Sequence, residues 1–269
     1  MILSLCASAS AAERDVERRV NELLARMTLA EKIGQLVQIN ASGGQLPDAL
    51  KERLRQGRLG SMLNEIVPAA SLEIQRIAVE ESRLGIPLLM GRDVIHGYRT
   101  IFPIPLAQAA AWNPQLVTDC AAVAAEEAAA AGFQWTFAPM MDIARDPRWG
   151  RIAEGFGEDT HLATVLAAAM VRGFQGDDYG APNRIAACAK HYAGYGAAEG
   201  GRDYDTAWIP EGLLRDVYLP PFKAAVDAGA ATVMTSFNEI NGVPSSGSGF
   251  LLRQVLRDEW GFKGFVVSD

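Results

Sequence analysis

The sequence predicts an α/β fold, a TIM-type (β/α)8 barrel in which about seven strands are present and the C-terminal part is incomplete. Helical and strand-like patterns alternate along almost the whole chain, which is typical of βαβ units and a parallel sheet. Polar side chains gather directly after the predicted strands. The 269 residues, 49% of them hydrophobic, are enough for one large core.

The predicted strands cover residues 35–40, 59–66, 85–93, 133–143, 184–192, 231–239 and 262–269. Predicted helices lie between them, at 47–57, 69–83, 113–132, 160–174, 210–228 and 248–260, after an N-terminal helix at 13–27. Thr28 and Glu31 have the spacing of a capping box and predict a further helix start. A doubly wound open sheet is the alternative, but no glycine-rich phosphate loop follows the first strand.

Composition narrows the function classes. The net charge is −7 and the basic residues form no cluster, so we expect no nucleic-acid partner. The apolar runs are too short to span a membrane. Residues 1–12 resemble the end of a secretory signal peptide, which predicts a periplasmic or secreted protein. Cys120 and Cys188 lie on separate apolar segments and are expected to be buried free thiols.

Several chemically capable residues follow the predicted strands. Asp93 could accept hydrogen bonds from substrate hydroxyls or simply cap a loop. The loop 142–159 combines Trp149 with three arginines, which favours a binding role over a solvated linker. Lys190 and His191 are adjacent, so both reach one ligand only if the strand bends there. Asp269 is a candidate nucleophile or a helix N-cap.

A metal-hydrolase interpretation uses the same positions. Asp93, His96, His191 and Asp269 could in principle hold a divalent ion. The chain has only three histidines and no His-x-His pair, so this interpretation is weak. We therefore expect no metal and no cofactor.

Several long segments, taken in order, resemble family 3 glycoside hydrolases, especially bacterial periplasmic β-glucosidases. The resemblance extends from "MTLAEKIGQL" to the last residue. The segments that show the resemblance are "DVIHGYRTIFP", "APMMDIARDPRWGRIAEGFGED", "KHYAGYGAAEGG", "MTSFNEINGVP" and "LRDEWGFKGFVVSD".

The resemblance implies a role for each matching residue. Asp269, in "VSD", corresponds to the catalytic nucleophile. Hydroxyl groups of the sugar are bound by residues at the positions of Asp93, Arg151, Lys190 and His191. Asp203 resembles the acid that supports the Lys-His pair. Phe237 stands where many members carry a tyrosine beside the nucleophile, so its contribution to substrate binding is left open.

The function implied is that of a retaining, exo-acting β-glucosidase whose substrate is a β-glucoside or an oligosaccharide. Residues 13–269 would form its barrel domain, truncated at the nucleophile. A C-terminal α/β sandwich domain, which usually supplies the acid/base glutamate, would be absent, so the fragment is expected to be inactive. A non-catalytic sugar-binding fragment and a β-xylosidase of the same family are the alternatives. Homo-oligomer formation by a full-length protein stays open.

Overall fold

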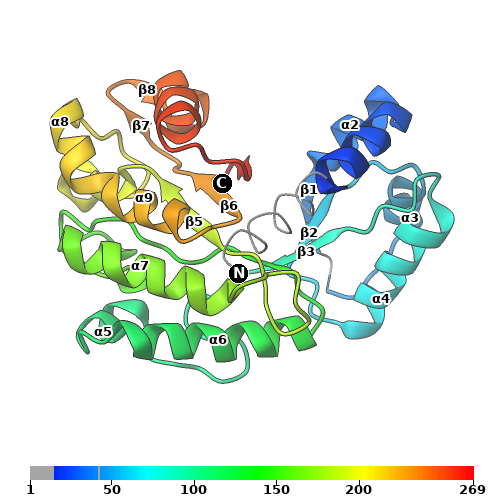
Figure 1. Cartoon of the computed structure of the whole chain (residues 1–269), viewed down its shortest axis with the longest axis horizontal. Helices are drawn as coiled ribbons and strands as arrows, with labels where there is room; N and C mark the ends of the chain where they lie inside the picture. Colours follow the sequence, from blue (N-terminus) through cyan, green and yellow to red (C-terminus); the bar gives the residue numbers. More distant parts are fainter. Residues whose placement is uncertain (1–14, 42) are drawn as a thin grey trace, which may run out of the picture. The chain divides into compact units, whose positions relative to one another are not determined.

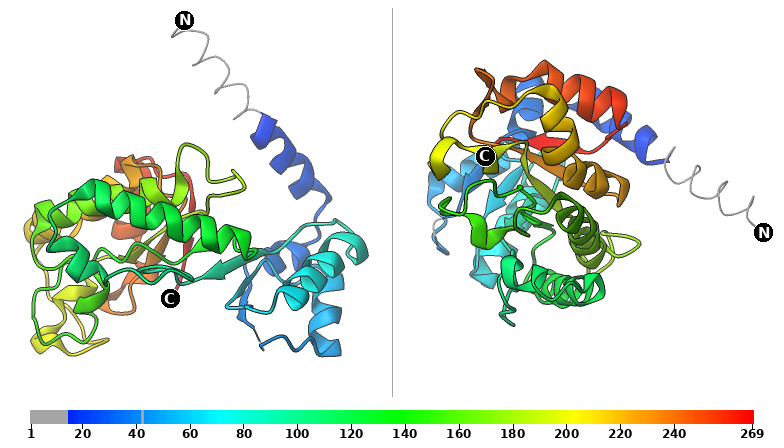
Figure 2. Two further views of the ribbon diagram at one scale, coloured as in Figure 1. Left: turned by 90° about the horizontal axis from the view of Figure 1, so that it is seen from below. Right: turned by 90° about the vertical axis from the view of Figure 1, so that its left-hand side faces the viewer.

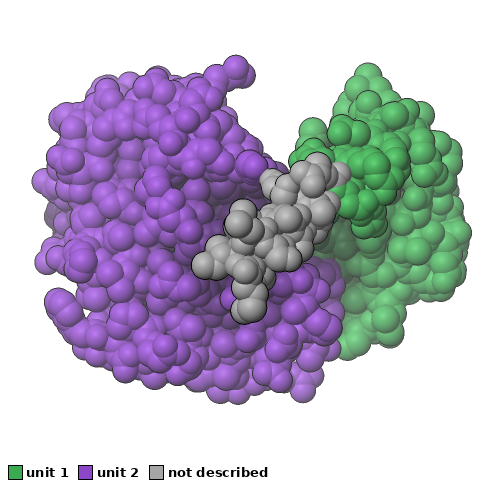
Figure 3. All heavy atoms as spheres, in the orientation of Figure 1, with its two compact units in different colours: residues 1–90 green, residues 91–269 purple. Residues whose placement is uncertain are grey.

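The computed structural model describes residues 15–41 and 43–269. The predicted signal-peptide segment, residues 1–12, lies outside this range. The chain divides into two compact units, Met1–Met90 and Gly91–Asp269, which are coloured separately in Figure 3.

The first unit alternates helices with short strands. After a helical segment at residues 15–26, its elements are α2 (Leu29–Gln35), β1 (Gln38–Asn40), α3 (Asp48–Arg55), β2 (Ser61–Leu63), α4 (Pro68–Arg76), a π-helical continuation of α4 (Ile77–Glu81) and the start of β3 (Leu89–Arg92). β1 and β2 pair in parallel, with Gln38 opposite Ser61. The amide of Leu89 donates to the carbonyl of Gly60, which joins β3 to the end of β2.

Thr28 begins α2 with the predicted capping box. Its hydroxyl accepts the amide of Glu31, and the Glu31 carboxylate accepts the amide of Thr28. Two backbone donors that a helix start leaves without helical partners are thereby satisfied. The capping box is confirmed, and Glu31 also binds Arg83 at 2.6 Å, which ties α2 to the segment before β3.

The second unit contains the longer helices. Its elements after β3 are α5 (Pro105–Ala109), α6 (Pro114–Ala130), β4 (Trp135–Thr136), α7 (Thr160–Gln175), β5 (Cys188–Tyr192), α8 (Glu211–Leu213) with a π-helical continuation (Leu214–Tyr218), α9 (Pro220–Asp227), β6 (Thr232–Thr235), β7 (Glu239–Ile240), β8 (Val243–Pro244), a π-helical segment (Phe250–Glu259) and β9 (Phe265–Val267). Short 3-10 turns cover Ile152–Glu154, Tyr195–Ala197, Glu199–Gly201 and Ser245–Gly247.

Parallel pairing connects the strands of the second unit. Gly91 of β3 lies opposite Trp135 of β4. β5 follows, because the amide of Cys188 donates to the carbonyl of Ala138, just beyond β4. β6 then pairs with both β5 and β9. Parallel strands direct their carboxyl ends to one edge, so residues that follow β3, β4, β5, β6 and β9 gather on the same side.

Helices α6 and α7 lie side by side along these strands, as Figures 1 and 2 show. Asn113 caps α6 by accepting the amide of Leu116, and Asp159 caps α7 by accepting the amide of Leu162. The small side chains of alanines let the two helices pack closely, and Gly173 allows a still closer approach. A Cβ at Gly173 would lie 2.4 Å from the carbonyl oxygen of Thr118, so only glycine fits there.

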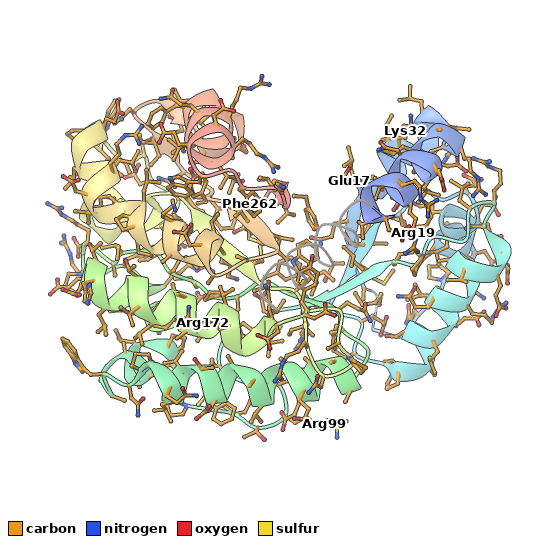
Figure 4. The ribbon with its side chains drawn as sticks, in the orientation of Figure 1. Glu17, Arg19, Lys32, Arg99, Arg172 and Phe262 are labelled. Carbon is orange, nitrogen blue, oxygen red and sulfur yellow. The ribbon has the colours of Figure 1, made fainter. Side chains whose placement is uncertain are left out.

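The core of the second unit is aromatic around Trp135. Its indole N–H donates to the hydroxyl of Thr232 at 2.8 Å, and its ring lies 4.4 Å from Phe137 and 5.2 Å from Phe265. Phe262, labelled in Figure 4, is buried between the Phe250–Glu259 segment and β9.

The predicted α/β class is confirmed. Each of the seven predicted strand regions contains a strand, namely β1 to β6 and β9, and each takes part in a parallel pair. Within residues 15–41 and 43–269 these strands do not form a closed barrel. The sequence interpretation missed the antiparallel hairpin of β7 and β8, whose two-residue strands are too short to show a hydrophobic period.

Two further sequence predictions can be checked against the described residues. None of their helices is both long and apolar enough to cross a bilayer. Cys120 and Cys188 are buried and free, as predicted. Complete burial raises the pKa of the Cys188 thiol to about 12, which keeps it protonated and unreactive.

Candidate active site

Lys190 and Asp93 form an ion pair at the carboxyl ends of two strands. Lys190 lies in β5, and Asp93 directly follows β3. The Lys190 Nζ lies 2.8 Å from Oδ1 of Asp93. The lysine side chain is 6% exposed, whereas that of Asp93 is 50% exposed. The pair therefore offers a carboxylate to solvent and holds the buried ammonium behind it.

β5 is irregular where the pair Lys190-His191 sits. Its register against β6 shifts between Ala189 and Tyr192, and the Lys190–His191 peptide bond is cis. Adjacent side chains of a regular strand point to opposite faces. Here Lys190 reaches Asp93 while His191 reaches two other carboxyl groups at the same strand edge. The shift of register is the bend that the sequence interpretation required.

His191 lies between two aspartates. Its Nδ1 is 2.8 Å from Oδ2 of Asp142, and its backbone amide donates to the same oxygen at 2.9 Å. Its Nε2 is 3.2 Å from Oδ2 of Asp269, without the angles of a hydrogen bond. The side chains of His191 and Asp142 are 1% and 0% exposed, and that of Asp269 is 24% exposed. We call these three residues, together with Asp93 and Lys190, the polar row. Of the three, Asp269 is the one whose side chain a ligand can reach.

Arg151 is held by a two-pronged ion pair. Its Nε and one terminal nitrogen donate to the two oxygens of Glu154, at 2.7 and 2.9 Å. Burial disfavours the charged guanidinium, but the bonds to Glu154 outweigh it and raise the pKa of Arg151. Burial likewise opposes the charge on Glu154, while Arg151, Lys190 and His191 together lower the pKa of Glu154. Both side chains stay charged at neutral pH.

Asp203 organises two aromatic residues of the surrounding loops. Its Oδ1 accepts the indole N–H of Trp149 at 2.9 Å and the hydroxyl of Tyr195 at 2.5 Å. Burial opposes the charged carboxylate, but these two bonds help to lower the pKa of Asp203. Burial and the bond to Asp203 raise the pKa of Tyr195, so its hydroxyl remains a donor. Asp203 therefore links loop 142–159 to loop 193–206.

Phe237 follows β6 and joins a group of rings beside His191. Its ring centre lies 5.9 Å from His191, 5.4 Å from Tyr195 and 5.0 Å from Tyr204. Phe237 is 42% exposed and Tyr204 is 63% exposed. These rings give the polar row a partly exposed apolar flank, which suits the C–H face of a sugar ring.

The structure links the predicted residues through different kinds of contact. Asp93 contacts Lys190, and Asp269 lies against His191, as described above. Arg151 is connected to this row through Tyr195, because its guanidinium lies 5.6 Å from the centre of that ring. Asp203 makes its side-chain hydrogen bonds to Trp149 and Tyr195. Its predicted support of the Lys-His pair stays a prediction; the ring of Tyr195, which Asp203 binds, lies 5.2 Å from His191.

The candidate list from the sequence left out three residues of this arrangement. Asp142 lies beyond the carboxyl end of β4, and that position was the available signal. Glu154 stands three residues after Arg151, the spacing of a helical ion pair. Tyr195 carries no signal of its own, because only the fold brings its hydroxyl to Asp203.

A metal-binding arrangement is not found in the part of the chain that the structure describes. There, no group of three or more His, Cys, Asp or Glu side chains is placed to hold a metal ion. His96, one of the candidate ligands, instead has its Nδ1 3.0 Å from the carbonyl oxygen of Phe102.

A match to a known protein family shows which family the chain belongs to. The model of the Glycosyl hydrolase family 3 N terminal domain matches residues 28–269. The chain belongs to glycosyl hydrolase family 3. This match includes every residue of the row from Asp93 to Asp269.

Relatives within family 3 include enzymes with two different names. A periplasmic beta-glucosidase of Salmonella typhimurium is 43% identical over 250 residues, covering 93% of this chain and 33% of the relative. A putative beta-xylosidase of Formosa agariphila is 39% identical over 276 residues, covering 94% of this chain and 36% of the relative. The chain thus spans about a third of the length of these relatives.

Solved structures of beta-glucosidases share the fold. The crystal structure of a beta-glucosidase from Listeria innocua in complex with glucose superimposes with a TM-score of 0.88 at 41% identity, covering 94% of this chain and 37% of that one. A b-glucosidase from Erythrobacter marinus gives a TM-score of 0.86 at 37% identity, covering 94% and 36% of the two chains.

Proposed function

We propose that the chain is the barrel part of a retaining, exo-acting β-glucosidase that removes terminal non-reducing β-D-glucosyl residues from glucosides or oligosaccharides. The observation that carries the proposal is the row of side chains at one strand edge, Lys190 with Asp93 and His191 with Asp269, in a family 3 chain. Residues 13–269 constitute this domain. The beta-glucosidases among the relatives favour glucose as the glycone.

The proposed roles follow from chemistry. The Asp269 carboxylate, being the exposed end of its row, attacks the anomeric carbon and forms a covalent glycosyl-enzyme intermediate. Lys190 and Arg151 are donors to sugar hydroxyls, Asp93 is an acceptor, and His191 contributes its Nε2 to the same site. Asp203 keeps Tyr195 and Trp149 in place around Arg151, and Phe237 contacts the apolar face of the sugar.

A second carboxyl group must protonate an ordinary leaving group in such a reaction. The recorded close partner of Asp269 is a histidine, and we assign the acid/base role to no residue among 15–41 and 43–269. The test of the nucleophile should therefore use a substrate that needs no protonation. With 2,4-dinitrophenyl 2-deoxy-2-fluoro-β-glucoside, an Asp269 oxygen bonds to the anomeric carbon, and dinitrophenolate departs with the electron pair.

We expect this reagent to add one fluoroglucosyl group to the chain, detected by intact mass and mapped by peptide sequencing to Asp269. Asp269→Asn keeps the shape of the side chain, removes the nucleophilic carboxylate and should abolish labelling. Asp258→Asn, at an acid on the π-helical segment away from the row, is the matched control and should label normally. A label on another acid would overturn the assignment of Asp269.

A β-xylosidase is the second candidate, because the Formosa agariphila relative carries that name. The two sugars differ by the hydroxymethyl group of glucose, so the corresponding 2-deoxy-2-fluoro-β-xyloside separates them. We expect faster labelling by the glucoside. Faster labelling by the xyloside would assign the chain to the second class.

We also propose that the protein is periplasmic or secreted. The similarity to a periplasmic beta-glucosidase supports this location, together with the signal-like composition of residues 1–12. Cell fractionation after expression of the gene with its own start tests it. Recovery of the mature protein in the cytoplasmic fraction alone would contradict it.

A further inference from the structure

Asp142 is a fully buried carboxyl group that makes both of its recorded hydrogen bonds through one oxygen. Its Oδ2 accepts the backbone amide of His191 at 2.9 Å and faces Nδ1 of the same residue at 2.8 Å. Its Oδ1 has no hydrogen-bond partner among the described residues. One oxygen of Asp142 thus contacts both the ring and the backbone amide of His191, which fixes the orientation of the ring.

The backbone places Asp142 there by strand pairing. The amide of Cys188 donates to Ala138, that of Lys190 to Pro139, and that of Met141 to Lys190. This ladder extends the pairing of β4 with β5 by several residues beyond Thr136. Asp142 is the first residue after the ladder, and His191 is its neighbour on the other strand.

The ring proton follows from this contact. Oδ2 already accepts an N–H and faces Nδ1, so Nδ1 must carry a hydrogen and donate it. The second ring nitrogen, Nε2, is then the one that lies 3.2 Å from Asp269. Without Asp142, a neutral histidine could place its single hydrogen on Nε2 and donate it to Asp269 instead.

We propose that Asp142 is a positioning residue, which fixes the Nδ1–H form of His191 and directs Nε2 at the candidate nucleophile and the sugar. This rests on the proposed function for its importance to catalysis, but the tautomer itself can be measured without turnover. Asp142 does not touch the substrate in this proposal and acts only through His191. With Nδ1 carrying the hydrogen, Nε2 of a neutral His191 faces Asp269 with its lone pair. Nε2 becomes a donor only when the ring is doubly protonated.

Other ionisable groups lie around the ring of His191. The titratable and charged side chains that face or adjoin His191 are Asp142, Glu154, Lys190, Tyr195 and Asp269. Because these groups remain in every variant except at Asp142, a change at one ring nitrogen alone reports the contact with Asp142.

The chain is well suited to this measurement, since it has only three histidines. Ring 15N labelling and two-bond 1H–15N correlation spectra follow each nitrogen through a pH titration. His96→Gln and His161→Gln assign the other two rings, which then serve as internal reports of folding. In the wild type we expect the Nδ1 of His191 to keep a protonated-type shift at every pH measured, because it donates to Asp142.

Two variants make the test specific. Asp142→Ala should move the deprotonated-type shift from Nε2 to Nδ1. Asp142→Asn can keep its amide oxygen at the position of Oδ2 and should preserve the wild-type pattern. If Asp142→Ala does not fold, the wild-type and Asp142→Asn titrations decide alone. A deprotonated-type Nδ1 in the wild type, or an Asp142→Ala spectrum identical to it, would overturn the proposal.

Failure of the proposed function would look different. Absence of covalent labelling at Asp269, with the Nδ1–H pattern intact, would reject the glycosidase mechanism and leave the positioning by Asp142 standing.

Discussion

Nε2 of His191 lies 3.2 Å from Oδ2 of Asp269. This contact connects the carboxyl end of β5 with the segment that follows β9. β6 lies between these two strands and pairs with both. The contact is possible because all three strands run in parallel and end at the same edge. The contact brings a buried histidine beside a partly exposed carboxylate at this edge.

Asp93 should contribute strongly to glycone binding. Asp93→Ala removes the acceptor that faces solvent and leaves the buried ammonium of Lys190 without its carboxylate partner. Hydrogen bonds to charged groups are worth about 1.5–3 kcal/mol, so the second-order rate constant of labelling by the fluoroglucoside should fall about 10- to 100-fold. Asp119→Ala, at an exposed acid on α6, is the control. An unchanged labelling rate in Asp93→Ala would remove Asp93 from the site.

Asp203 should stabilise the fold by satisfying two buried donors. Asp203→Ala leaves the indole N–H of Trp149 and the hydroxyl of Tyr195 without their acceptor, so we expect a loss of about 2–3 kcal/mol in the free energy of unfolding. Tyr195→Phe removes only one of the two bonds and should cost about 1 kcal/mol. Urea denaturation measures both, with the exposed Tyr179→Phe as control. Equal losses for the two variants would show that Trp149 does not depend on Asp203.

Gln175 should be a structural link between α7 and two strands. Its Oε1 accepts the amides of Ala187 and Ala231, and its Nε2 donates to the carbonyl of Gly229. Gln175→Leu has nearly the same size but leaves three backbone groups without partners, so unfolding should become easier by about 3 kcal/mol.

The control for this prediction is Gln115→Leu, an exposed glutamine on α6 that binds only Asp119. It should change the urea midpoint very little. A midpoint for Gln175→Leu equal to that of Gln115→Leu would mean that the three backbone groups find other partners.

Glu31 should make the stability of the first unit depend on pH. The bonds from Arg83, and then from the amide of Thr28, lower the pKa of Glu31 from 4.5 to about 2. Because the folded-state pKa is the lower one, the stabilisation is complete above the unfolded-state pKa. It is lost as the pH falls from about 4.5 toward about 2.

Glu31→Gln removes this titration, so the variant should be less stable than the wild type near neutral pH and approach it in acid. Urea denaturation at about pH 6 and about pH 3 measures the two differences. Lys32→Gln, at a neighbouring position on the same helix, is the control. A stability difference between wild type and Glu31→Gln that does not shrink in acid would contradict the assigned pKa.

Several features could be derived from the sequence alone. Alternating patterns predicted the α/β class and the regions of all seven parallel strands, because a strand buried in a parallel sheet needs a continuous apolar run. The cap at Thr28 was also predicted, since it depends on side chains three residues apart. Resemblance to family 3 predicted Asp93, Lys190, His191 and Asp269 as site residues.

The tertiary structure decided how these residues meet. Neither the shift of register within β5 nor the ladder that carries Asp142 to His191 leaves a pattern in the sequence, because each depends on pairing between distant strands. The same holds for Asp203, whose two donors come from separate loops. Local sequence determines which elements form, through propensity, capping and hydrophobic period. Which carboxyl group faces which donor is determined only when the strands are packed in register, since a one-residue shift would turn each side chain to the other face.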